Sequence, residues 1–323
     1  MDHARLSREL LRALRGRRAQ RSLSKRLGYR TNVVYTWESG RREPSAAEAL
    51  GLARAVGVDP AGALRGFFRS PPEWLDRLDP ATPEAVRLLL VDLAGELPAV
   101  ELAARTGVSR HAVGRLLRGQ AQPSLAELLR LVDAASRRAL DLVACFVDPA
   151  RLPSFAAAWA DLSARRAIAA DLPWSQAVLR VLELEAYRSM PAHRPGWIAH
   201  LLGISAVEEA RCLEALVDAG QVVAEGGTYR PAAVLTVDTR PDPAAGRRQR
   251  RHWCEVALDR LARDRPGLYS YNVFTVSSAD LERIREMHLA YFRALRAVVA
   301  ASEPGEHVVV ANVHLFSLAD APR

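Results

Sequence analysis

A segment near the N-terminus occurs twice in this chain, at an offset of 79 residues. Residues 28–45 contain a glycine that suits a tight turn, a short helical stretch, and a loop that ends in Pro-Ser. The second copy keeps the same residue types: Arg26, Gly28, Val34, Gly40, Pro44 and Ser45 align with Arg105, Gly107, Val113, Gly119, Pro123 and Ser124. The repeat therefore predicts two copies of one small helical module in a single chain.

The first module, residues 1–70, has the apolar spacing of a small helical domain. Its helices are expected over residues 6–14, 20–27, from about 31, and from 46 to 56. In the third helix, Val34 and Trp37 stand three residues apart, which places both on the inner face. The polar side chains on or near the outer face would be Thr31, Asn32, Tyr35 and Glu38.

The nine residues from Trp37 to Ser45, Trp-Glu-Ser-Gly-Arg-Arg-Glu-Pro-Ser, carry a specific resemblance. Together with Gln20, Gly28 and Val34, they closely resemble the Xre-type (lambda-repressor-like) helix-turn-helix of bacterial transcriptional regulators. The resemblance implies that the third helix enters the major groove of double-stranded DNA. It implies DNA contacts at Gln20, Arg30, Thr31, Asn32, Tyr35, Arg41 and Arg42.

The roles implied at these positions differ, and each has a plain structural alternative. Gln20 would touch a phosphate or brace the third helix. Asn32 would read adenine through two hydrogen bonds, as asparagine does in the major groove. Arg41 and Arg42 would grip phosphates, or would simply belong to a solvated loop. The less favoured alternative for Thr31 and Asn32 is that they are ordinary residues at the start of a helix.

The distribution of charge favours a DNA-facing role for the first module. Residues 1–70 carry 15 basic and 6 acidic side chains, whereas residues 71–150 carry 9 and 11. Residues 151–323 are nearly balanced, so the net charge of +8 comes from the first module. A localised basic excess is what binding to polyphosphate requires. The preference for arginine over lysine, with Lys25 the single lysine, more plausibly reflects coding bias.

The second module, residues 81–148, keeps the helix pattern but is degenerate where the first module would meet DNA. Ala99 stands in the place of Gln20, and Leu117 in the place of Glu38. Its last helix is expected to run from residue 125 to about residue 146. The second copy therefore repeats the helix pattern of the first module but not the side chains of its predicted DNA-binding surface.

Charge gives two competing interpretations of this second copy. Glu96 and Glu101 would bring negative charge to its second helix, which phosphate would repel. The outward part of its third helix is nevertheless basic and supplies a second set of candidate DNA contacts: Arg110, His111, Arg115 and Arg118. The module is either a second reader of an adjacent half-site or a repeat kept for packing or dimer contacts.

The C-terminal half begins with a unit over residues 170–238 that looks like a winged helix. Helices are expected over residues 175–187, 197–202 and 205–219, and residues 221–231 form a hairpin that turns at Gly-Gly. The third of these helices is acidic, with Glu208, Glu209, Glu214 and Asp218 against Arg211. Such a helix would be repelled by DNA, so a structural or protein-contacting role is favoured.

The last unit, residues 250–320, is expected to be a small strand-helix-strand unit. Residues 269–276 and 307–318 alternate apolar and polar side chains as strands do, and a long helix is expected between them. Residues 238–249 are expected to be a linker with a basic end, Arg247 to Arg251, which is more plausibly a solvated run than a phosphate contact. If the two strands pair, Asn272, His288, Asn312 and His314 would converge; ordinary sheet polars are the favoured interpretation.

This C-terminal half resembles a domain of unknown function that follows helix-turn-helix segments in bacterial regulators. The likeness covers roughly residues 170–320 and is carried by His252 and by residues 269–277, 279–296 and 312–318. It implies regulation and not chemistry. The sequence thus predicts a multidomain chain with an all-α tandem helix-turn-helix half and an α+β half.

Other functional classes receive little support. The histidines and cysteines lack the paired spacing of a zinc site, and no phosphate loop or nucleophile motif is evident, so we expect no metal, no cofactor and no enzyme activity. No apolar run reaches the ~18–20 residues that span a bilayer. Cys145, Cys212 and Cys254 show no disulfide framework, and we expect a cytoplasmic, nucleoid-associated protein.

The function predicted from the sequence is sequence-specific DNA binding for transcriptional regulation. The partners expected are double-stranded DNA, a second copy of the chain in a homodimer, and an unidentified small-molecule or peptide effector. The C-terminal half would form the dimer or bind the effector. The alternative is a protein-interaction or antitoxin-like partner in which DNA binding is secondary.

Overall fold

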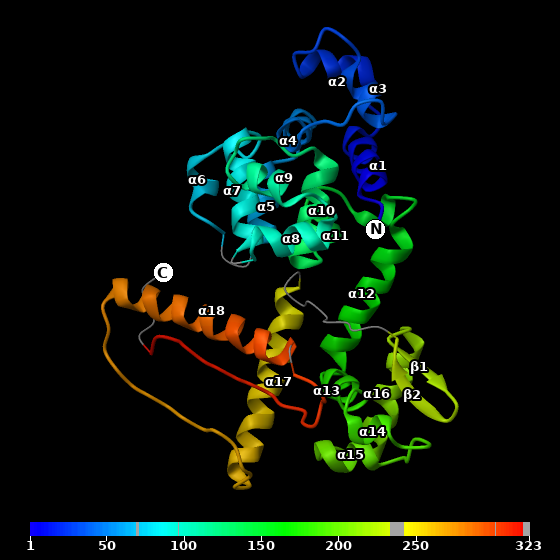
Figure 1. Ribbon diagram of the computed structural model, residues 1–323, viewed down its shortest axis with the longest axis vertical. Helices are drawn as coiled ribbons and strands as arrows, with labels where there is room; N and C mark the ends of the chain where they lie inside the picture. Colours follow the sequence, from blue (N-terminus) through cyan, green and yellow to red (C-terminus); the bar gives the residue numbers. More distant parts are fainter. Residues whose placement is uncertain (69–70, 96, 233–241, 301, 319–323) are drawn as a thin grey trace. The chain divides into compact units, whose positions relative to one another are not determined.

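The computed structural model describes residues 1–68, 71–95, 97–232, 242–300 and 302–318. This part of the chain is mainly helical and contains one small two-stranded sheet (Figure 1). It divides into two compact units, Met1–Leu162 and Ser163–Arg323. The division falls inside helix α12 (Ala156–Asp171). No helix of the described residues is long and apolar enough to cross a membrane.

Within residues 1–68, five helices form the first module, and polar side chains begin three of them. Asp2 accepts a backbone N–H at the start of α1, and Asp59 does the same at α5. Ser45 and Glu48 form a capping box at α4, in which each side chain accepts the other's backbone N–H. The helices are α1 (His3–Arg15), α2 (Gln20–Arg26), α3 (Val33–Glu38), α4 (Ala46–Ala55) and α5 (Pro60–Phe67).

The second module repeats this order of helices. Thr82 caps α7, Ser109 caps α9, and Ser124 forms a second capping box with Glu127 at α10. A short helix, α6 (Trp74–Arg77), precedes the module. Its helices are α7 (Pro83–Ala94), α8 (Ala99–Thr106), α9 (Arg110–Leu117), α10 (Leu125–Ser136) and α11 (Ala139–Ala144).

One helix of the second module is interrupted where the sequence predicts continuity. The helix expected over residues 125–146 is divided at Arg137, which has a left-handed φ of 54°. The turn brings Arg138 over Phe67 of the first module, with its guanidinium carbon 4.0 Å from the ring centroid. Arg138 Nη2 also donates to the Phe67 carbonyl at 2.8 Å. The prediction of one continuous helix is wrong, because helical spacing carries no information about these contacts with the first module.

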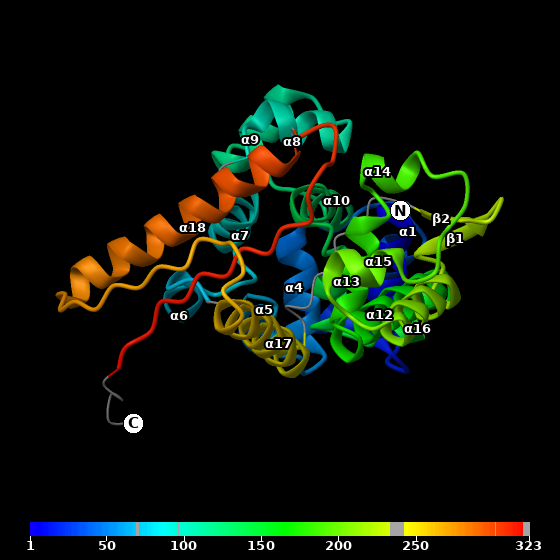
Figure 2. The ribbon, with the colours of Figure 1, turned by 90° about the horizontal axis from the view of Figure 1, so that it is seen from below.

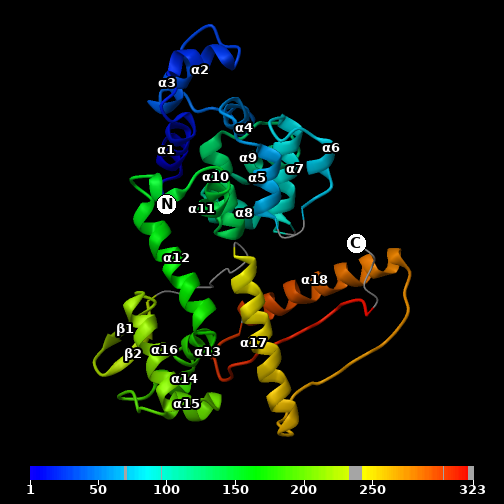
Figure 3. The same ribbon diagram turned by 180° about the vertical axis from the view of Figure 1, so that it is seen from behind.

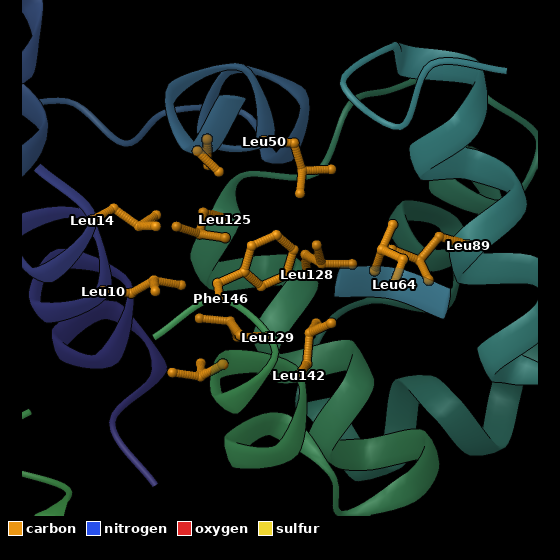
Figure 4. Close-up of a pocket in the computed structure, with 13 residues that line it drawn as sticks. Leu10, Leu14, Leu50, Leu64, Leu89, Leu125, Leu128, Leu129, Leu142 and Phe146 are labelled. Atoms are coloured by element: carbon orange, nitrogen blue, oxygen red, sulfur yellow. The ribbon is translucent and has the colours of Figure 1, made fainter. Parts of the chain in front are cut away.

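One apolar core serves both modules. Leu6 and Leu11 of α1 are buried in the same cluster as Leu129 and Val132 of α10, each at 1% exposure or less. Helix α1 runs along α10 within this core. Side chains from both modules also surround a cavity of about 30 Å³ (Figure 4). Its apolar walls and small size make it a packing void, well below the volume that holds a small-molecule ligand.

The two modules also meet through their backbones. Ser45 and Ser124 form an isolated antiparallel bridge. Ala46 N donates to Pro123 O, and Leu125 N donates to Pro44 O, both at 2.9 Å. These two hydrogen bonds are equivalent under the 79-residue repeat, so the bridge has local two-fold symmetry.

The second unit contains a helical core followed by a hairpin (Figure 3). Val178, Leu179, Ile198 and Leu216 are fully buried in this core. The elements are α13 (Trp174–Val181), α14 (Glu185–Arg188), α15 (Trp197–Leu202), α16 (Ala206–Asp218), β1 (Val222–Glu225) and β2 (Thr228–Pro231). The strands pair antiparallel around Gly226 and Gly227, as predicted. The remaining helices are α17 (Pro243–Ala262) and α18 (Ser278–Ala300).

Two boundaries in this unit differ from prediction. The helix expected over residues 175–187 is split into α13 and α14, which allows Leu184 and Tyr187 to be buried at 5% and 2% exposure. Residues 243–249, predicted as linker, belong to α17. Asp242 accepts two backbone N–H groups there, and Pro243 suits the first helical position. The remainder of the predicted linker, residues 238–241, lies outside the described residues.

The predicted strand-helix-strand unit is also wrong in its strands. Helix α18 forms, but residues 269–276 and 307–318 are extended without a ladder partner in the described chain (Figures 1 and 2). Alternating side chains are a strand pattern, but a strand also needs a neighbouring backbone to bond with. Most of their apolar side chains are exposed instead, including Tyr271 at 94% and Phe316 at 74%, whereas Val308 packs against the core of the second unit.

Two of the polar side chains expected to converge between those strands, Asn312 and His314, contact helix α17 instead. Asn312 Nδ2 donates to the carbonyl of Trp253 at 2.9 Å, and His314 Nε2 lies 3.6 Å from Cys254 Sγ. Both partners lie on α17. His288 stacks with Phe292 on its own helix. The C-terminal segment is therefore attached to α17 through side chains and not through a sheet.

Candidate nucleic-acid interface

A tight turn between α2 and α3 sets the orientation of the third helix. Gly28 has φ +85°, a left-handed conformation that glycine adopts without strain. After this turn, Val33, Val34 and Trp37 are buried at 3% exposure or less. The inward prediction for Val34 and Trp37 is confirmed. The opposite side of α3 is consequently left for solvent.

A buried charged cluster fixes the end of α3. Arg15 binds Glu38 through two hydrogen bonds, Nε to Oε1 at 2.6 Å and Nη2 to Oε2 at 3.1 Å. Gln20 Nε2 donates to the same carboxylate at 2.7 Å. The bond to Glu38 raises the pKa of the Arg15 guanidinium further above its usual range. We call Arg15, Gln20 and Glu38 the α3 brace.

This cluster corrects one sequence expectation and clarifies another. Glu38 was expected on or near the outer face of α3, but it is 3% exposed because Arg15 and Gln20 pair with it from inside. Of the two roles considered for Gln20, its amide makes the bracing contact. A buried carboxylate that accepts several charged or polar hydrogen bonds is a strong positional constraint.

The N-terminal end of α3 is set by Asn32 and Ser24. The helix begins at Val33, two residues later than predicted, and the Asn32 side chain at the N-cap makes no capping hydrogen bond. Its Oδ1 lies 3.2 Å from Ser24 Oγ, which also accepts the N–H of Val34 at 3.1 Å. Asn32 is half-buried, whereas Arg30 and Thr31 are exposed.

The exposed side of α3 leads into the loop over residues 39–45, which contains Arg41 and Arg42 and is called the arginine loop here. Tyr35 is 42% exposed, and the guanidinium carbon of Arg41 lies 5.4 Å from its ring centroid. This contact holds an aromatic ring and a positive charge together at the surface. Arg41 forms no ion pair with a described residue, so its charge is available to an anion.

Arg42 is more constrained than Arg41. Its Nη2 lies 2.7 Å from Glu48 Oε1, which also accepts the Tyr29 hydroxyl at 2.6 Å. Burial, and then the bond to Glu48, raise the pKa of Tyr29. Burial alone would raise the pKa of Glu48, but hydrogen bonds from Tyr29 and Ser45 and the charge of Arg42 outweigh it and lower that pKa. Arg42 therefore approaches an anion only from its solvent side.

Further basic side chains surround these positions. Those on α2 and its two flanking turns are exposed and form no ion pair with any residue that the structure describes. They are Arg17, Arg18, Arg21, Lys25, Arg26 and Arg30. Together with Arg41, they give the α2–α3 surface an uncompensated positive charge, which is the electrostatic requirement for phosphate binding.

The second module presents its own exposed basic helix. Ser109 caps α9 by accepting the N–H of Ala112 at 3.2 Å, while Val113 and Leu116 are buried. The four side chains predicted to contact DNA from this helix are all exposed: Arg110, His111, Arg115 and Arg118. Arg118 lies 3.4 Å from Gln120 Oε1, and these side chains form no ion pair within the described chain.

The acidic residues that argued against the second module have a smaller effect than their number suggests. Glu101 forms an ion pair with Arg105 one turn away. Glu96 lies outside the described residues. The charge of α8 is therefore partly compensated, and the outer face of α9 remains basic.

The α3 brace is replaced as a set in the second copy. The positions of Arg15, Gln20 and Glu38 are taken by Ala94, Ala99 and Leu117. Loss of Arg15 or Glu38 alone would leave the charge of the other without its ion-pair partner, whereas replacement of all three leaves an apolar contact. The second module thus holds α9 by packing, where the first holds α3 by charge.

The second unit offers a weaker surface for DNA. Glu209 of α16 is 2% exposed and accepts the N–H groups of Gly196 and Ala199, so it positions α15. Glu214 and Asp218 remain exposed on the same helix. In the basic run on α17, Arg251 pairs with Glu255 at 2.7 Å. No three described His, Cys, Asp or Glu side chains are grouped so that they could hold a metal ion.

Two segments of the chain match known protein families. Residues 11–62 match the helix-turn-helix family, which spans α1 to α5. The chain contains a helix-turn-helix domain. Behind the helix-turn-helix, residues 173–318 match a domain of unknown function (DUF4423). Both resemblances predicted from the sequence are confirmed. No curated protein and no solved structure matches the chain significantly.

Several residues that build the helix-turn-helix surface were not predicted. Arg15, Ser24 and Glu48 hold α3 and the arginine loop, yet none belongs to the sequence stretch that carries the resemblance most strongly. Each acts across a separation of 6 to 23 residues. Helical spacing reports which face is buried, but not which polar side chain is paired there.

Proposed function

We propose that this protein is a sequence-specific DNA-binding transcriptional regulator whose first module reads the major groove with α3. The observation that carries this proposal is the braced helix itself. Arg15, Gln20 and Glu38 fix α3 from inside, while Thr31 and Tyr35 face solvent beside unpaired basic side chains. A rigid helix with an exposed polar face and a positive surround is what major-groove reading requires.

The roles proposed for the side chains follow from their positions. Thr31, Asn32 and Tyr35 lie at the start and on the outer side of α3 and would contact base edges. Arg30 and Arg41 have no ion pair in the described chain and would contact phosphates. Such contacts position the protein, whereas base contacts specify the sequence. This is a binding function, and we assign no catalysis to it.

The experiment begins with selection of a binding site from a random-sequence DNA pool by the full-length chain. Arg41→Ala should weaken binding to selected and unselected DNA alike, and should reduce the slope of log affinity against log salt by about 1. Arg211→Ala removes an exposed arginine from α16 and serves as the matched control. Failure of the chain to enrich any sequence would reject the proposed function.

The proposal extends to the C-terminal half, which we assign to homodimerisation. Its support is the exposed apolar surface of α18 and the two extended segments beside it, including Tyr271, Val273, Val309 and Phe316 at 74–94% exposure. Exposed apolar surface of this extent marks an interaction site. A second copy would bring an identical extended backbone to each segment. Antiparallel pairing about a two-fold axis would then give the backbone N–H and C=O groups of both copies hydrogen-bond partners.

Dimerisation is tested by the mass of the full-length chain in solution. We expect twice the 35.4 kDa of one chain, and a Val273→Asp with Phe316→Asp variant should be monomeric. Val207→Asp alters an equally exposed apolar side chain on α16 and should leave the dimer intact. A monomeric wild-type chain would exclude the homodimer and would direct the search to a different protein partner or an effector.

The unit formed by α13, α15, α16 and the β1–β2 hairpin is proposed to be a winged helix with a structural role. Support comes from the order of its elements and from the exposed acidic side chains of α16, Glu214 and Asp218. Because these would face phosphate in a DNA complex, groove binding by this unit is disfavoured. A regulator of this kind acts at the chromosome, so cytoplasmic and nucleoid-associated placement forms part of the proposal.

A further inference from the structure

We infer that α9 is a second DNA-reading helix, related to α3 by the two-fold axis of the module pair, so that one chain binds two different half-sites in inverted orientation. This inference rests on the proposed function of the first module. It assigns a nucleic-acid site to residues 110–118, which lie outside the helix-turn-helix match over residues 11–62.

The first support is the symmetry of the backbone bridge. Ala46 N to Pro123 O and Leu125 N to Pro44 O are equal in length and exchange under the repeat. Each strand of the bridge continues directly into a capping box. A reciprocal antiparallel pair has a local two-fold axis, which relates the backbones of the two modules at the bridge.

The second support is independent of the bridge and comes from the core. Thirteen side chains line the cavity between the modules, and eight of them form four pairs that are each 79 residues apart (Figure 4). They are Leu10 with Leu89, Ala49 with Leu128, Leu50 with Leu129, and Leu64 with Val143. An interface in which the same positions from both partners meet is isologous, as in a two-fold dimer. The two modules therefore form a dimer-like pair within one chain.

The bridge also couples the orientations of the two reading helices. Helix α3 ends at Glu38 and reaches the bridge at Ser45, and α9 reaches it at Ser124 by a loop of equal length. Arg8 contacts the loop glycine Gly40, and its equivalent Arg87 contacts Gly119. We infer that these matching loops extend the two-fold relation from the bridge to α3 and α9, although α8 packs closely on α10 and α2 packs little on α4. Two-fold-related recognition helices bind inverted half-sites.

The chemistry of α9 differs from that of α3. Its exposed face presents Arg110, His111 and Arg115, where the first module has Thr31, Asn32 and Thr36. Arginine reads guanine through O6 and N7, whereas asparagine suits adenine. The inverted half-sites should therefore be unlike in sequence, with guanine favoured at the positions that α9 contacts.

The test uses the full-length chain and the site selected from the random DNA pool. We expect hydroxyl-radical footprints of two protected half-sites per chain. Arg110→Ala combined with Arg115→Ala should remove protection from one half-site, keep it on the other, and weaken binding at least tenfold. Arg130→Ala, which alters a half-buried arginine on α10, serves as the control. Wild-type footprints in the Arg110/Arg115 variant would overturn the inference.

Spacing supplies the second arm of the test. Because the bridge fixes the modules, insertion of about 5 base pairs between the half-sites, roughly half a helical turn, should release one of them. Unchanged protection after insertion, or half-sites in direct orientation, would also overturn the inference. A selected site with one half-site per chain rejects α9 but leaves the proposed function of α3 standing. Absence of any selected site rejects the proposed function itself.

Discussion

At the scale of single residues, this protein uses paired polar side chains to hold α3, the proposed reading helix. The carboxylate of Glu38 is buried, and its partners Arg15 and Gln20 lie on α1 and α2. The second module replaces all three positions with apolar residues. The two copies therefore provide an internal comparison between a charged brace and an apolar one.

Glu38→Leu alone should destabilise the first unit by about 3 kcal/mol, because Arg15 would lose the carboxylate that balances its half-buried charge and Gln20 would lose its hydrogen-bond acceptor. Combining Glu38→Leu with Arg15→Ala and Gln20→Ala reproduces the second module and should restore much of that loss. Urea denaturation followed by circular dichroism measures both variants. A triple variant less stable than Glu38→Leu would show that the brace does not act as a set.

The Glu48 carboxyl gives a prediction about pH. Its folded pKa is lowered below the ordinary value of 4.5, so it contributes stability above that value and loses the contribution as pH falls through the folded pKa. Glu48→Gln should therefore reduce the free energy of unfolding by about 1 kcal/mol at pH 7. At pH 3 the variant and the wild type should differ less. An equal difference at both values would contradict the assignment.

At the scale of elements, α3 and α9 differ in the side chain that precedes their first turn. Ser109 caps α9, which begins at Arg110, whereas Arg30 occupies the equivalent place before α3, which begins later at Val33. Ser109→Ala should cost about 1 kcal/mol of stability. Arg30→Ala, its matched control, should cost close to nothing, because no capping bond is lost. Thermal unfolding of both variants distinguishes the two outcomes.

The sequence predicts such elements well where the signal is local and poorly where it is not. The inward positions Val34 and Trp37 follow from helical spacing, and the hairpin at residues 221–231 follows from its glycines. The buried position of Glu38 could not be predicted, because its partners lie 18 and 23 residues away. The segments at residues 269–276 and 307–318 have a strand pattern, but alternation does not say whether a neighbouring strand exists.

At the scale of the whole molecule, the modules of the first unit depend on each other. They share one apolar core, and Arg138 of one module packs on Phe67 of the other. Leu129→Ala should cost about 2–5 kcal/mol, as large-to-small changes in cores do. Amide hydrogen exchange should show faster opening in α1 and α4 as well as in α10. Faster exchange confined to the second module would indicate two independent cores.

The decisive measurement compares specific and non-specific DNA binding by the wild-type chain and by Thr31→Ala combined with Asn32→Ala. If α3 reads bases, the double variant should bind the selected site at least about 30-fold more weakly, since each base contact contributes about 1–3 kcal/mol of discrimination. Its affinity for unselected DNA should stay unchanged, because no charge is lost. A double variant that binds the selected site as tightly as the wild type would contradict the claim that α3 is the reading helix.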